Sequence, residues 1–199
     1  MNPATWPTRL LVVDVEGNGA QPPDLIEFAA VPAQAGLVNA EIAWSTLVRP
    51  PVPITRRATD LHGISNEAVK TAPTWSEISG EVRELLEGAW IAAHNAHVDY
   101  NVLVRLLPGW QPVGVIDTLK LSRHILGKAT RHNLDALIEH TGIDTSRIPG
   151  QRHRALFDAH ATGLLLVDLA DHFPTFADLA AVAVPTGMPG APEPEGTLW

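Results

Sequence analysis

In "LLVVDVEGNG", residues 10 to 19, two acids stand at the end of an otherwise apolar run. The residues from Leu10 to Val15 are mostly apolar and β-branched, as in a strand from the middle of a sheet. Asp14 and Glu16 are two residues apart, so their side chains point to the same face of such a strand. The pair alone leaves two interpretations open: a strand end whose acids are solvated, or half of a metal site.

The rest of the chain predicts a mixed α/β layer. Segments 24–31 and 40–48 follow turn-rich breaks and, with the first strand, predict a three-stranded antiparallel meander. Strands and helices then alternate, which is typical of an α/β fold. Further strands are expected at 90–93 and 113–117, helices near 74–88, 98–107, 118–126, 133–141 and 155–171, and an irregular segment at 59–65.

Composition limits the class of protein. A chain of 199 residues is long enough for one domain with a sizeable core. The absence of cysteine excludes disulfides and thiolate metal sites, so a metal would need oxygen or imidazole ligands. No run approaches the roughly 18 apolar residues that cross a bilayer, and no targeting segment is recognisable, so we expect a cytoplasmic protein with no membrane partner. The net charge of −8 argues against broad adhesion to duplex nucleic acid, but it does not exclude a phosphodiester substrate bound through cations.

Two further segments carry acids where acids are unexpected. In "AAHNAHVDYNVLVRLL", residues 92 to 107, Asp99 lies in the first turns of an amphipathic helix, where it could simply favour the positive helix end. In "QRHRALFDAHATGLLL", residues 151 to 166, Asp158 lies inside an apolar helix, where an unpaired carboxylate is costly. His153 is five residues earlier, which places it off the face of Asp158, so we expect it in the loop before the helix. Taken alone, His153 is equally compatible with an ordinary surface histidine.

Together the three segments predict a site for hard cations. Four carboxylates at strand ends and helix starts suit Mg²⁺ or Mn²⁺, and two such ions about 4 Å apart would stabilise a phosphoryl displacement. An imidazole titrates near neutral pH, so a neutral His153 could take a proton from an attacking water.

These segments resemble the three motifs of the DnaQ-like, or DEDDh, family of 3′→5′ exonucleases: "VVDVEGNG", "AHNAHVDYNVL" and "HRALFDA". The resemblance covers about residues 8 to 172 and implies a ribonuclease H-like fold with a mixed five-stranded sheet flanked by helices. It also implies release of nucleoside 5′-monophosphates from the 3′ end of DNA or RNA. By position, Asp14, Glu16, Asp99 and Asp158 would hold two metal ions, and His153 would be the general base.

The resemblance extends to residues that would bind substrate. Leu61, His62 and Ile64 of "LHGI" match the segment that packs against the terminal base in relatives, and Asn95 matches the asparagine of the second motif. Gly17, Asn18 and Gly19 replace the common Thr-Thr-Gly, so contact with the terminal sugar would rely more on backbone amides. The sequence leaves DNA and RNA open as substrates, and the lack of a large basic surface favours short or single-stranded ends.

The end of the chain and its partners complete the predictions. Residues 173–199 are expected to be a C-terminal extension, flexible from about residue 185, where Pro, Gly, Ala and Glu predominate. We consider two alternatives to a free-standing enzyme: a catalytically silent nucleic-acid-binding module, and a proofreading subunit that docks on a polymerase. A homodimer is a further possible partner arrangement.

Overall fold

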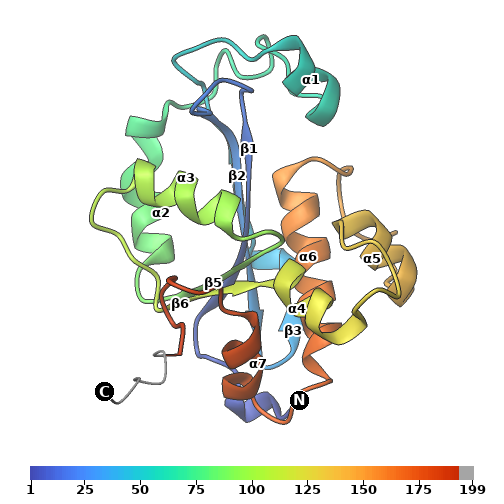
Figure 1. Cartoon of the computed structure of the whole chain (residues 1–199). Coiled ribbons are helices and arrows are strands. Elements are labelled where there is room, and N and C mark those ends of the chain that lie inside the picture. The colour runs from blue at the N-terminus through green and yellow to red at the C-terminus, as the bar shows by residue number, and fades with distance from the viewer. Residues whose placement is uncertain (193–199) are drawn as a thin grey trace, which may run out of the picture.

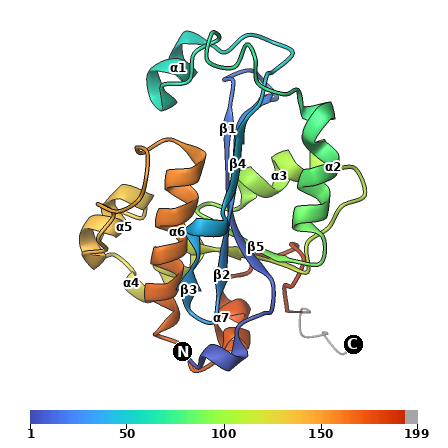
Figure 2. The same ribbon diagram turned by 180° about the vertical axis from the view of Figure 1, so that it is seen from behind.

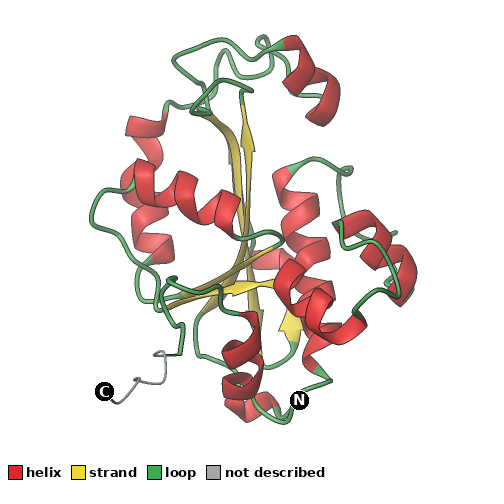
Figure 3. Ribbon diagram, viewed as in Figure 1, coloured by secondary structure: helices red, strands yellow, loops and turns green. Residues whose placement is uncertain are grey.

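The computed structural model describes residues 1 to 192, and its centre is a mixed six-stranded sheet (Figures 1 and 3). The strand order is β3-β2-β1-β5-β6, and β4 also pairs with β2. The strands are β1 (Leu10–Gly17), β2 (Leu25–Gln34), β3 (Leu37–Val38), β4 (Trp44–Leu47), β5 (Trp90–Ala93) and β6 (Gly114–Asp117). The predicted α/β fold is confirmed, and the sheet has six strands instead of five because the two-residue β3 also pairs with β2.

The predicted antiparallel meander is formed by β1, β2 and β4. In its register Val13 faces Ala30, Glu16 faces Glu27, and Phe28 faces Thr46. The third strand is shorter than predicted because residues 40–42 form a 3₁₀ turn, η2 (Ala40–Ile42), where the Asn39 side chain accepts a hydrogen bond from the Glu41 amide.

The strands β1, β5 and β6 run parallel to one another. Val12 faces Ala92 across the first pair, and Ala93 faces Asp117 across the second. The carboxyl ends of parallel strands meet at one edge of a sheet, which is where ligands bind in open α/β sheets. This edge therefore carries the segments that follow all three strands.

Helices cover both faces of the sheet. In Figures 1 and 2, α2 and α3 lie on one face, and α5 and α6 lie on the other. Helix α6 packs against β1 and β2, and Gly163 permits the close approach, since a Cβ there would lie 3.1 Å from Val38 Cγ1. The helices are α1 (Arg56–His62), α2 (Trp75–Leu86), α3 (His97–Leu106), α4 (Thr118–Leu126), α5 (Leu134–Thr141), α6 (Ala155–Ala170) and α7 (Phe176–Ala183). No helix among residues 1 to 192 is long and apolar enough to cross a membrane.

Two helices differ from the sequence prediction. The segment expected to be irregular contains α1, whose first turn is capped by the Thr55 hydroxyl and whose end is set by Gly63 at φ 75°. Helix α7 was not predicted, although Thr175 and Asp178 form a capping box at its start. Both helices are short, so their apolar periodicity is weak.

The chain just beyond α7 packs against the rest of the fold. Met188 is buried in the main core, and the Val115 amide donates a hydrogen bond to Pro189 O (3.1 Å). The segment thereby covers the edge of β6, and the flexibility predicted from about residue 185 stays a prediction. Residues 193–199 of the predicted tail lie outside the described residues, and the domain boundary predicted at residue 172 stays a prediction.

Candidate active site

Three of the predicted acids meet at the carboxyl end of β1. Asp14, Glu16 and Asp158 each offer a carboxylate oxygen, and these atoms lie within 4.8 Å of one another. Asp14 and Glu16 are brought together by the two-residue period of the strand, and Asp158 comes from the first turn of α6. Three carboxylates at this spacing fit a hard divalent cation.

Asp99 completes the acidic group from the other face of the sheet. It lies in the first turn of α3, is 4% exposed, and its Oδ1 accepts a hydrogen bond from the Val15 amide (3.1 Å). This bond anchors the start of α3 to β1 between the two acids of the strand. Asp99 is thus held next to the three-carboxylate cluster without being part of it.

Burial and mutual repulsion hold protons on these acids. Burial raises the pKa of Asp14, and the charges of Asp99 and Glu16 raise it further. Burial also raises the pKa of Glu16 to about 8, with the charges of Asp158 and Glu27 acting in the same direction. The pKa values of Asp99 and Asp158 rise to about 8 and about 6, again mainly through burial. A bound cation relieves such crowding because it inverts the local electrostatics.

His153 lies in the turn before α6, as predicted. Its backbone is left-handed, with φ 60°, and its amide donates a hydrogen bond to Asp158 Oδ2 (3.0 Å). The side chain is exposed at the rim of the acidic group. The turn therefore ties the histidine backbone to one carboxylate of the cluster and leaves the imidazole accessible to water.

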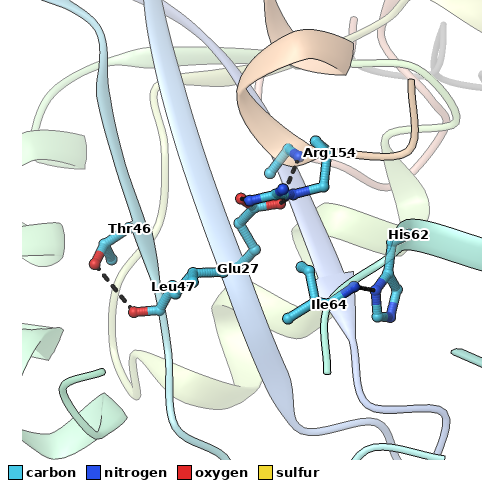
Figure 4. A network of polar contacts seen from close by, with 7 residues as sticks. Glu27, Thr46, Leu47, His62, Ile64 and Arg154 are labelled. Carbon is cyan, nitrogen blue, oxygen red and sulfur yellow. Dashed lines mark hydrogen bonds and ion pairs between the residues drawn. The ribbon is translucent and has the colours of Figure 1, made fainter. Parts of the chain in front are cut away.

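An ion pair that the sequence did not predict fixes the start of α6. Arg154 Nε and Nη2 donate to both carboxylate oxygens of Glu27 at 2.6 to 3.1 Å, and the Ala155 amide donates to Glu27 Oε2 (2.9 Å). Figure 4 shows the two side chains reaching each other between β2 and the helix. Glu27 replaces a helix cap, because no side chain of the segment itself caps α6. The signal was present in "LIEFAAV", where an acid stands inside an apolar strand and requires a partner.

The loop after Glu16 is closed by Asn18. Its side chain is fully buried; Nδ2 donates to Asp24 Oδ2 and Val52 O (both 3.1 Å), and Oδ1 accepts from the amides of Ala20 and Asp24. Gly19 adopts φ 81° and lies against Thr55, which leaves no room for a side chain. The substrate-binding role of Gly17, Asn18 and Gly19 stays a prediction, and the Asn18 amide is fully used within the chain.

The segment "LHGI" is divided between the core and the surface. Ile64 is 2% exposed, and its amide donates to His62 Nδ1 (3.0 Å), as drawn in Figure 4. His62 is 1% exposed, and its Nε2 has no hydrogen-bond partner among the described residues. Leu61 is 59% exposed. Of the three predicted contacts with a terminal base, Leu61 is thus the one whose side chain is freely accessible.

Asn95 lies in the turn between β5 and α3, with φ 64° and an exposed side chain. The backbone amide of Asn95 donates to Asp117 Oδ1 (3.1 Å). The same oxygen caps α4 by accepting from the Leu119 backbone amide (2.8 Å). Asp117 therefore joins the segments that follow β5 and β6. This joining role was not predicted from the sequence.

The fold and the site together define a nuclease of the ribonuclease H-like class, and the comparisons give the family. An exonuclease family model, RNase_T, matches residues 11–166, so the chain belongs to this exonuclease family. The solved structure of exonuclease X in complex with 5′ overhanging duplex DNA has a TM-score of 0.72 and is 29% identical, with 87% of this chain and 97% of that one covered. The nuclease domain of 3′hExo, a DEDDh family member bound to rAMP, shares the fold, with a TM-score of 0.67 at 18% identity over 82% of this chain and 92% of that one. The DnaQ-like resemblance, and with it the enzyme class of 3′→5′ exonucleases, is confirmed at the level of the family.

The curated relatives are much longer than this chain. The chain is 38% identical over 159 residues to a DNA polymerase III subunit epsilon-like protein of Rhodobacter capsulatus, a match that covers 76% of this chain and 22% of that protein. It is 31% identical over 170 residues to the 3′-5′ exonuclease DinG of Bacillus subtilis, which covers 82% of this chain and 18% of that protein. The chain thus spans about a fifth of the length of these relatives.

Proposed function

We propose that this chain hydrolyses the terminal phosphodiester at the 3′ end of a nucleic acid, with divalent cations held by Asp14, Glu16 and Asp158. The observation that carries the proposal is the meeting of these three carboxylates within 4.8 Å at the end of β1. Family membership and the fold shared with exonuclease X support it. The products would be nucleoside 5′-monophosphates.

The donor set fits Mg²⁺ or Mn²⁺, because all its members are carboxylate oxygens. When bound, a metal pair supplies charge stabilisation for the attacking and leaving oxygens of a phosphoryl displacement. Asp14, Glu16 and Asp158 hold the cations, while Asp99, fixed by the Val15 amide, holds a cation directly or through a water. His153 takes the proton from the attacking water, since its imidazole stands at the rim of the group.

The direct test uses the purified chain and a single-stranded oligonucleotide labelled at its 5′ end. Mg²⁺ or Mn²⁺ should support shortening by single nucleotides from the 3′ end, and chelator should stop it. His153→Ala should lower kcat by about 10²- to 10⁴-fold if the side chain is the general base. His172→Ala, which removes another exposed histidine, is the matched control and should keep full activity.

Two results would count against the proposal. Absence of hydrolysis of matched DNA and RNA oligonucleotides, single-stranded and paired, in both metals would reject the exonuclease and favour the silent binding module. Full activity of His153→Ala would reject only the role of that histidine. The same set of substrates decides between DNA and RNA.

A second candidate is a proofreading role beside a polymerase. It is favoured by similarity to the epsilon-like protein and to a PolC-type DNA polymerase III of Thermotoga petrophila, 34% identical over 159 residues. This match covers 76% of this chain and 11% of the polymerase. Recovery of a polymerase with the tagged chain from its own cells, and preferential removal of a mismatched 3′ nucleotide, would support this role.

A further inference from the structure

The segment from Thr118 to Asn133 differs in charge from the rest of the chain. It contains Lys120, Arg123, Lys128 and Arg131 and no Asp or Glu, whereas the whole chain has 14 basic and 22 acidic residues. The segment comprises α4 and the loop that leads to α5. In Figure 1 it lies on the same side of the sheet as α6, whose first turn carries Asp158.

Two of these cations line a groove beside the candidate active site. The groove has a volume of about 450 Å³, and the exposed side chains of Arg123, Arg131 and Asn95 form part of its wall. The remaining lining residues are His94, Leu119, His132 and Asn133.

The wall of the groove is held in place by hydrogen bonds. The ring of His94 bonds Thr118 Oγ1 and His132 O, both at 2.9 Å, and the ring of His132 bonds Gly127 O (2.7 Å) and Ser122 Oγ (3.0 Å). These contacts tie the end of β5 to α4 and to the loop after it. The positions of the two arginine backbones are therefore defined by the fold, although their side chains reach into solvent.

In the described part of the chain, no carboxylate pairs with the cations of this segment, two of which line the groove. Among residues 1–192, Arg123, Lys128 and Arg131 make no ion pair, whereas Arg152 pairs with Asp135 and Arg154 pairs with Glu27. Lys120 is engaged differently, since its Nζ donates to Val184 O (2.6 Å) and supports the end of α7. Four cations without an acid in one segment of an acidic protein create a locally positive potential, which favours a negatively charged ligand.

One turn of chain joins the groove wall to the acidic site. Asn95 forms part of the groove wall, and Asp99 lies four residues further on, in the first turn of α3. A single phosphate can occupy either the acidic site or the groove. A strand carries several phosphates, so one can lie at the acidic site while others lie beside the arginines. This arrangement fits a strand whose 3′ end lies at the acids.

We propose that this groove binds the phosphodiester backbone of the strand being cut, upstream of its terminal nucleotide, through Arg123 and Arg131. The proposal rests on the exonuclease function proposed above. It adds a second binding site, which makes the affinity for the substrate depend on the length of the strand. It predicts that longer single strands bind better than the shortest ones and that this advantage is sensitive to salt.

The test compares the wild-type chain with R123Q/R131Q on a single-stranded oligonucleotide of about 15 nucleotides and on a dinucleotide. The logarithm of kcat/KM is plotted against the logarithm of salt concentration for each. Each lost phosphate contact should reduce the salt slope for the long strand by about 0.7, hence by about 1.4 for the double variant. At low salt the KM for the long strand should rise about tenfold, and kinetics on the dinucleotide should not change. Each single variant should give about half of the change in slope.

The matched control is R9Q/K70Q, which removes the same amount of charge elsewhere. Arg9 precedes β1 at the opposite end from the acids and donates to Leu85 O, and Lys70 pairs with Glu67 on the exposed connection after α1. The control should keep the wild-type slope, and thermal unfolding should show that both double variants are folded. Equal slopes in R123Q/R131Q and wild type, an equal loss on the dinucleotide, or a change seen only with duplexes would overturn the proposal. Inactivity of the wild type on every substrate would instead reject the proposed function.

Discussion

Glu16 on β1 and Glu27 on β2 face each other directly in the sheet register, and their carboxylates have opposite surroundings. Glu27 accepts hydrogen bonds from Nε and Nη2 of Arg154 and from the Ala155 backbone amide. Glu16 shares its site with Asp14 and Asp158 and has a pKa raised to about 8. The fold therefore neutralises the carboxylate that fixes the start of α6 and leaves without a counter-charge the three carboxylates that we propose as cation ligands. The Glu27–Arg154 pair holds two elements of the fold together, whereas the three crowded carboxylates hold no element in place through an ion pair.

The largest test of this contrast is Asp14→Asn. Loss of a cation ligand should lower kcat by at least about 10³-fold, which corresponds to about 4 kcal/mol of transition-state stabilisation. In chelator the same variant should unfold at a higher temperature than wild type, because burial and the charges of Asp99 and Glu16 disfavour a carboxylate at this position, and an amide is neutral without taking up a proton. Oligonucleotide hydrolysis and thermal unfolding in EDTA measure the two effects.

Asp168→Asn is the control for Asp14→Asn, since Asp168 lies exposed near the other end of α6. It should keep wild-type activity. A lower unfolding temperature for Asp14→Asn in EDTA would mean that the acid stabilises the metal-free fold, contrary to the repulsion described above.

The second test removes the charge of Arg154 and of Glu27 in turn, and so breaks their ion pair. Glu27 is 7% exposed and Arg154 is 35% exposed as side chains, so the carboxylate has less access to water. Arg154→Gln should therefore cost about 3 kcal/mol of unfolding free energy, because it leaves a buried charge beside Glu16, whereas Glu27→Gln should cost about 1 kcal/mol. Urea denaturation of both variants and of the double variant measures the costs and their coupling.

Both variants should also lower kcat more than they change KM, because the pair places the helix start that carries His153 and Asp158. Arg56→Gln is the control, since it breaks the exposed pair of Arg56 with Asp60 and should cost less than about 1 kcal/mol. A greater cost for Glu27→Gln than for Arg154→Gln would contradict the assignment of the buried charge to Glu27.

The sequence predicted the three clustered acids, but it did not predict the ion pair of Glu27 with Arg154. Asp14 and Glu16 are linked by strand periodicity, and Asp158 stands out as an acid inside an apolar helix, so local physics indicates each of them. The pairing of Glu27 with Arg154 spans 127 residues, and no local rule names the partner. Helix α2 was predicted and begins at a capping box of Thr74 and Glu77, whereas α1 was missed. Helix α1 is only seven residues long, so it shows little apolar periodicity, and its limits are set by its cap and by Gly63.

The third test uses pH. The carboxyls of Glu16 and Asp99 have pKa values of about 8 in the fold, above the ordinary values near 4 of an unfolded chain. The folded state therefore binds more protons between these values, so stability in chelator is greatest at low pH and falls as pH rises from about 4 through about 8. Between pH 5 and pH 8.5 we therefore expect the free energy of unfolding in chelator to fall by more than about 1 kcal/mol.

Adding Mg²⁺ or Mn²⁺ should restore stability, more at pH 8.5 than at pH 5, because ions compete with protons for the same oxygens. Urea denaturation across this pH range, with and without EDTA, measures both effects. In the Asp14→Asn background the fall with pH should be smaller. A metal-free stability that rises steadily with pH would contradict the raised pKa values.

The smallest expected effect concerns Arg152, which flanks His153 on the side opposite Arg154. Arg152 Nη1 lies 2.6 Å from Asp135 Oδ1, a distance as short as that of the Arg154 pair, but both side chains are more than 40% exposed. An exposed pair gains little because water screens it, so Arg152→Gln should change the unfolding free energy by less than about 0.5 kcal/mol and kcat by less than about twofold. Urea denaturation and oligonucleotide hydrolysis beside Arg154→Gln measure the difference. A comparable loss in the two variants would mean that proximity to His153, and not burial of the partner carboxylate, decides which arginine holds the start of α6.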